Sequence, residues 1–142
     1  MRKWFPLISA ALLCVAIVVI NSPAKVEGQT SEQRIFELRT YITHPGRLDA
    51  LNRRFREHTN RIFAKHGMTI VGFWTPTEGP DQGNKLVYML AYPSREAADA
   101  AWNAFRADPD WTAAKAASEQ DGPIVKKVIS EFLQPTDYSP IK

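Results

Sequence analysis

The stretch HGMTIVGFWTPTEGPDQGNKLVYMLAY, residues 66–92, decides the fold. It contains two runs rich in β-branched and aromatic residues, 68–77 and 85–92, of the kind that strands prefer. The residues between the runs favour turns, and they include Pro76, Gly79, Pro80, Asp81, Gly83 and Asn84. The stretch therefore predicts a β-hairpin, which we expect at the centre of a sheet with any pocket opening beside its first strand.

Strand and helix patterns continue on both sides of the hairpin. Apolar residues recur at helical spacing over 46–66, and Gly67 follows as the expected left-handed stop. In chain order we expect strand 34–42, helix 46–66, strands 68–77 and 85–92, helix 94–107, short helix 110–118, strand 124–133 and an extended tail, 134–142, that could strap across a neighbouring subunit. The order βαββαβ predicts an α+β, ferredoxin-like fold: a four-stranded antiparallel sheet with helices on one face.

The second strand of the hairpin is apolar on both faces. Leu86, Tyr88, Leu90 and Tyr92 alternate with Val87, Met89 and Ala91. A strand with two apolar faces is normally covered on both. Since the predicted helices suffice for one face, we expect a second copy of the chain on the other, which gives a homodimeric α+β barrel.

Residues 1–28 have the layout of a secretory signal peptide. Arg2 and Lys3 precede an uncharged apolar run, 7–20, and small residues suited to cleavage follow it. We therefore expect export to a periplasm or secretion, with membrane attachment only if the signal stays uncleaved. The predicted mature domain is 29–142.

The composition of that domain excludes several classes of function. Without residues 1–28 the chain has 15 basic and 14 acidic residues, a net charge of +1, and no cysteine. A nearly neutral domain offers no basic footprint for nucleic acid. The absence of cysteine excludes thiol nucleophiles, disulfides and cysteine-based metal sites, and it suits a bacterial periplasm.

Two histidines are the first candidates for chemistry. His66 lies at the predicted helix C-terminus, where a protonated imidazole is favoured, and it is a candidate general base or a simple helix cap. His58 is a candidate ligand-binding residue or a partly buried helix residue. The two are eight positions apart, roughly 12 Å along a helix, so one ion cannot bridge them. We expect no metal and no cofactor.

Aromatic residues and one arginine supply the other candidates. Trp74, Trp102 and Trp111 either line an apolar pocket or form part of the core. Arg39 and Tyr88 are candidates to orient a substrate, unless Arg39 merely pairs with Glu37 in solvent.

An ordered set of segments resembles the NIPSNAP family. They are ELRTY (37–41) before Pro45-Gly46, His66-Gly67 before GFW (72–74), NKLVYMLAY (84–92), Ala101-Trp102 with Phe105, Asp108-Pro109 with Trp111, and FLQPTDYSP (132–140). The resemblance spans about 34–141 and implies a dimeric α+β barrel. That superfamily includes monooxygenases, haem-handling enzymes and isomerases, so the resemblance does not select a reaction.

Two functions from different classes follow. The first is a homodimeric module that binds a small hydrophobic molecule or another partner. The alternative is a cofactor-independent enzyme of monooxygenase or isomerase type, with His66 as base and Arg39 or Tyr88 orienting a small hydrophobic substrate.

Overall fold

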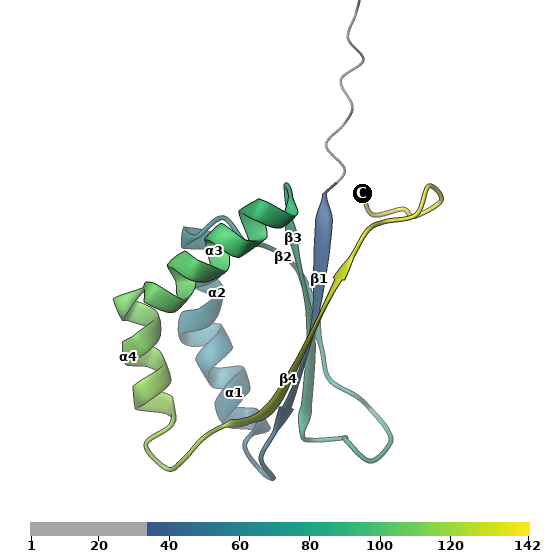
Figure 1. Ribbon diagram of the computed structural model, residues 1–142. Helices are drawn as coiled ribbons and strands as arrows, with labels where there is room; N and C mark the ends of the chain where they lie inside the picture. The colour runs from purple at the N-terminus through teal and green to yellow at the C-terminus, as the bar shows by residue number, and fades with distance from the viewer. Residues whose placement is uncertain (1–33) are drawn as a thin grey trace, which may run out of the picture.

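A computed structural model describes residues 34–142, so the predicted signal peptide lies outside the described residues. The elements are β1 (Ile35–Thr43), α1 (Leu48–Arg54), the π-helical turn η1 (Phe55–Thr59), α2 (Asn60–Lys65), β2 (Thr69–Trp74), β3 (Lys85–Tyr92), α3 (Arg95–Ala107), α4 (Pro109–Ser118) and β4 (Val125–Leu133). All strand pairs are antiparallel, in the order β2-β3-β1-β4. The helices form one layer on one side of this sheet, and this confirms the predicted α+β, ferredoxin-like fold (Figure 1).

The sequence predicted that the hairpin β2–β3 lies at the centre of the sheet, but only one of its two strands is central. Strand β3 pairs with both β1 and β2, whereas β2 is an edge strand with a register shift between Ile70 and Gly72. Strand β1, which belongs to no hairpin, takes the other central position. The prediction failed because hairpin signals show which strands are sequence neighbours but not which strand pairs with the first one.

The long predicted helix is interrupted in the middle. It runs as α1, η1 and α2, and the amide of Asn60 bonds the carbonyl of Phe55, five residues earlier. Thr59, which breaks the apolar stripe in the sequence, is buried in this turn and its hydroxyl donates to the carbonyl of Arg54. Gly67 has φ +73°, as expected for the residue that ends the helix.

The core lies between the helices and the sheet, and Tyr88 is at its centre. Its ring makes edge contacts with Tyr41 and Phe55, at centroid distances of 5.3 and 5.2 Å, and lies tilted against Phe63 and Phe73. Aromatic pairs in these geometries stabilise a core beyond the area that they bury. This cluster fixes the position of the helices over β1, β2 and β3.

The opposite face of the sheet carries no helix (Figure 1). Among the apolar residues on it, Trp74, Ile129 and Leu133 are 52%, 38% and 39% exposed. The C-terminal tail returns towards the start of β1, where Arg34 Nε donates to the carbonyl of Lys142 at 2.7 Å. The tail thus contacts its own sheet, while much of this open face remains uncovered.

Candidate functional site

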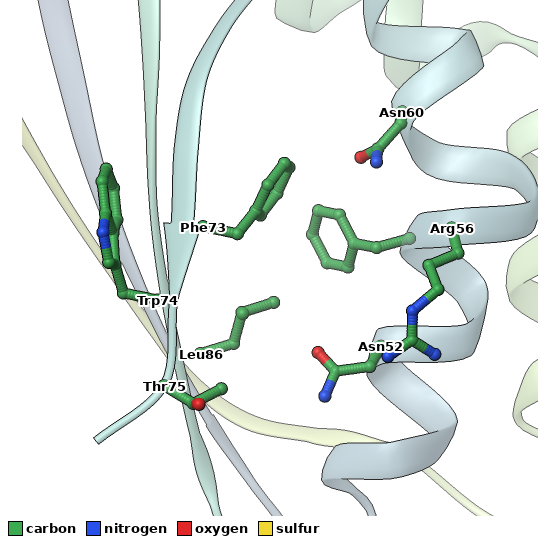
Figure 2. A pocket seen from close by; sticks show the side chains of 8 residues that line it. Asn52, Arg56, Asn60, Phe73, Trp74, Thr75 and Leu86 are labelled. Atoms are coloured by element: carbon green, nitrogen blue, oxygen red, sulfur yellow. The ribbon is translucent and has the colours of Figure 1, made fainter. Parts of the chain in front are cut away.

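A cavity of about 340 Å³ opens between the helix layer and the end of β2 (Figure 2). Its walls come from two sides, and the lining residues are Asn52, Phe55, Arg56, Asn60, Phe73, Trp74, Thr75 and Leu86. Figure 2 shows Phe73 and Leu86 directed towards the helix, whereas the Trp74 ring projects from the other side of β2. Half of the lining residues are apolar and half are polar, and the volume is at the lower end of the range for small-molecule sites.

Two polar groups of this cavity, on Asn60 and Arg56, lack partners among residues 34–142. Asn60 Oδ1 is buried and accepts no hydrogen bond from residues 34–142. Arg56 makes neither a hydrogen bond nor an ion pair within the same range. Buried polar atoms normally find a partner, so an unpaired amide oxygen beside a cavity indicates a position for water or ligand.

The π-helical turn lies directly beside these groups. Asn52, Arg56 and Asn60 are spaced by four residues, and the turn from Phe55 to Thr59 lies between the first and last of them. Single π-helical turns inside α-helices are rare and often occur at functional sites. None of these three residues was among the candidates predicted from the sequence, although their spacing places them on one helix face. The π turn has no sequence signal of its own.

A second polar cluster is buried between β1 and α3, around Glu37. This side chain is only 1% exposed. Its carboxylate accepts hydrogen bonds from four side chains: Arg39, Tyr92 (2.8 Å), Trp102 Nε1 (2.6 Å) and Ser130 (2.6 Å). Burial alone would raise the pKa of Glu37, but the bonds from Ser130, Trp102 and Arg39 hold it below its usual value. Glu37 therefore stays ionised in the interior.

Arg39 and Tyr88, two predicted catalytic candidates, both lie near this cluster. Arg39 is stacked over Trp102, with 4.1 Å from its guanidinium carbon to the ring centroid, and also donates to the Tyr41 hydroxyl. The Arg39–Glu37 pair is thus buried instead of solvated, which corrects the alternative considered from sequence. The Tyr88 hydroxyl is buried without a hydrogen-bond partner in the described chain. Burial and the adjacent Tyr41 raise its pKa, which disfavours the phenolate that base catalysis would need.

His66, the third catalytic candidate, is held by a carboxylate. Its Nε2 lies 2.6 Å from Asp108 Oδ2, and Lys65 Nζ lies 2.8 Å from the same oxygen. Asp108 also caps α4 by accepting from the amide of Asp110. Hydrogen bonds from Lys65 and His66 hold the pKa of Asp108 well below its usual value. This arrangement orients the imidazole, but it also ties the end of α2 to the start of α4, and His66 does not line the cavity of Figure 2.

The predicted ligand-binding group does not converge on one place. Trp102 is in the core, and Trp111 stacks on Phe105 at 4.6 Å. Trp74 is on the open face of the sheet, and His58 lines a different cavity, of about 390 Å³, between α1, η1 and α4. Only Trp74 also borders the cavity of Figure 2.

Residues 34–142 contain no group of three or more histidine, aspartate or glutamate side chains placed to hold a metal ion. Within the same part of the chain, no helix has the length and apolar character needed to cross a membrane.

The model of the NIPSNAP family matches residues 36–140, and the chain belongs to this family. A NIPSNAP family protein of unknown function from Agrobacterium tumefaciens is similar in structure, with a TM-score of 0.68 and 22% identity over 78% of this chain and 96% of that one. An uncharacterized NIPSNAP-like domain protein from Burkholderia xenovorans gives 0.67 and 21%, over 77% and 90%. None of the curated proteins compared with the chain matches it. At these identities the solved structures support the fold and do not identify a ligand or a reaction.

Proposed function

We propose that the chain is an exported, homodimeric module that binds a small molecule in the cavity between η1 and β2. One observation carries the proposal: a cavity with aromatic side chains in its wall also contains a buried amide oxygen and an exposed guanidinium that have no partner in residues 34–142. A buried polar atom without a partner costs roughly 1–3 kcal/mol, which water or a ligand in the cavity offsets. A ligand with a complementary polar group would gain affinity from the same atom.

The walls of the cavity are suited to hold such a ligand in one orientation. Phe55 and Phe73 meet edge to face at 5.4 Å, and both rest on Tyr88, which is fully buried. Because the rings are fixed by the core behind them, the cavity keeps its shape before binding. A preformed site loses less entropy on binding than a mobile one.

The proposed homodimer covers the open face of the sheet. Trp74, Ile129 and Leu133 are exposed there, and the half-buried Leu38 and Met89 lie between them. A contiguous apolar surface of this kind is typical of an interaction site in a soluble protein. A second copy of the same sheet supplies a matching surface through a twofold axis.

The enzyme hypothesis has one observation in its favour, the His66–Asp108 pair. A carboxylate within hydrogen-bond distance fixes the tautomer of a histidine base. Against it, His66 borders none of the cavities described above, and Arg39 is already paired with Glu37. Binding without catalysis therefore agrees better with the geometry.

A fragment screen on protein expressed from the full sequence tests the binding proposal. Binding is detected by ligand-observed NMR and repeated with Thr75→Trp, which adds bulk at an exposed residue of the cavity wall. Thr77→Trp, two residues further along and outside the lining, is the matched control. We expect fragments that bind the wild type and Thr77→Trp but not Thr75→Trp. If every fragment is indifferent to Thr75→Trp, the cavity is not the binding site.

A further inference from the structure

We infer that the ligand is a small aromatic carboxylate with a neutral hydrogen-bonding group, such as a hydroxyl, at its other end. This inference rests on the proposed function of the cavity and deepens it. It follows from the charge, the order of the polar groups along the cavity, and the volume.

The charge on the cavity wall is a single uncompensated cation. Arg56 is the only charged residue in the lining, which contains no carboxylate. Two other arginines of the described chain, by contrast, are paired with carboxylates: Arg39 with Glu37 and Arg54 with Glu119. A guanidinium binds a carboxylate through two parallel charge-assisted hydrogen bonds, which are stronger than neutral ones. The free charge at this wall therefore favours an anionic ligand.

The polar groups are separated along the cavity. Figure 2 shows Asn60 at one end and the Arg56 guanidinium near Asn52 at the other, with Phe73 facing the helix between them. Arg56 is exposed, so it lies at the solvent side, while Asn60 Oδ1 is buried. An amide both donates and accepts, so a ligand hydroxyl satisfies Asn60 in either orientation of its side chain.

Size and shape fix the middle of the ligand. At the ~30 Å³ that each molecule of liquid water occupies, a cavity of about 340 Å³ holds about 11 non-hydrogen atoms. A single aromatic ring packs edge to face or offset against the Phe55–Phe73 pair. A ring with a short acidic arm and an opposite hydroxyl, as in 4-hydroxyphenylacetate, meets all three requirements.

Three probes separate these requirements by calorimetric titration of protein expressed from the full sequence. They are 4-hydroxyphenylacetate, its neutral primary amide, and phenylacetate, which lacks the hydroxyl. We expect the acid to bind about tenfold more tightly than the amide, and phenylacetate to bind several-fold more weakly than the hydroxylated acid.

Two arginine variants assign the charge effect. Arg56→Gln should abolish the preference for the acid over the amide. Arg53→Gln should retain it, because Arg53 is also exposed but lines the other, 390 Å³ cavity. Circular dichroism checks that both variants are folded, and both substitutions are at exposed positions that make no described ion pair.

The outcomes distinguish the inference from the proposal beneath it. Equal binding of acid and amide, with both blocked by Thr75→Trp, overturns the carboxylate inference and leaves the binding function intact. The carboxylate inference is also overturned, and the binding function is again left intact, if none of the three probes binds while a neutral fragment does bind and Thr75→Trp blocks it. If no compound of any kind is sensitive to Thr75→Trp, the proposed function falls and the inference falls with it.

Discussion

Replacing Glu37 by Gln tests whether the buried polar cluster holds β1, β3, β4 and α3 together. The carboxylate accepts from Arg39, Tyr92, Trp102 and Ser130, which lie on these four elements. Glutamine keeps the volume of the side chain but removes its charge. Its amide NH₂ group would also face side chains that themselves donate hydrogen bonds. Arg39, 15% exposed, then has no counter-ion.

The expected loss is large for a domain of this size. Removing one partner of a buried ion pair costs about 3–5 kcal/mol, because the remaining charge stays desolvated. At about 4 °C for each kcal/mol, the midpoint of thermal unfolding should fall by about 12–20 °C. This is a sizeable fraction of the total free energy of unfolding, about 5–15 kcal/mol.

Urea unfolding followed by tryptophan fluorescence measures this change, since Trp102 belongs to the cluster. Glu78→Gln, in the exposed hairpin loop, is the matched control and should change the free energy of unfolding by less than about 0.5 kcal/mol. The double variant Glu37→Gln/Arg39→Met should recover part of the loss, because it removes both charges. A Glu37→Gln variant as stable as Glu78→Gln would refute the reasoning.

Three further predictions concern the other features. His66→Ala should lower the free energy of unfolding by about 1 kcal/mol without changing ligand affinity, whereas His66→Gln, which can still donate to Asp108, should be closer to wild type. Denaturant titration measures the stability and calorimetry measures the affinity. Loss of binding in both variants would favour the enzyme hypothesis. The folded-state pKa values of Glu37 and Asp108 lie below their ordinary values of 4.5 and 3.8, so their stabilising contributions are present above those values and are lost as the pH falls through the folded-state pKa values. Asp108→Asn should therefore flatten the acid side of a plot of the thermal-unfolding midpoint against pH. An unchanged slope would argue against the capping role. Ile129→Arg, at the centre of the open face of β4, should halve the mass found by light scattering, whereas the control Lys126→Ala should leave it unchanged. A monomeric mass for the wild type would refute the proposed dimer.

The fold was largely predictable because its local signals agree with one another. Strand β3 was predicted with its observed bounds, Lys85–Tyr92, since period-2 alternation and turn residues mark both of its ends. Gly67 and Ser94 marked a helix end and a helix start correctly, and the Ser94 hydroxyl accepts from the amide of Ala97. These features depend on residues close in sequence, which is why sequence reasoning detects them.

The candidate site was less predictable because it depends on distant contacts. Glu37 reaches Trp102 and Ser130, 65 and 93 positions away, and nothing local indicated that a strand carboxylate would be buried. Tryptophan content suggested a pocket, but strand alternation places Trp74 on the open face, opposite to Trp102. The π turn that places Asn60 beside the cavity has no sequence signature that we could use.

A crystal structure of the protein with 4-hydroxyphenylacetate tests the central claim most directly. The account predicts the ring packed against the Phe55–Phe73 pair, the carboxylate on Arg56 and the hydroxyl within hydrogen-bond distance of Asn60. Ligand density at His58 in the other cavity, at the open face of the sheet, or beside His66 would contradict it.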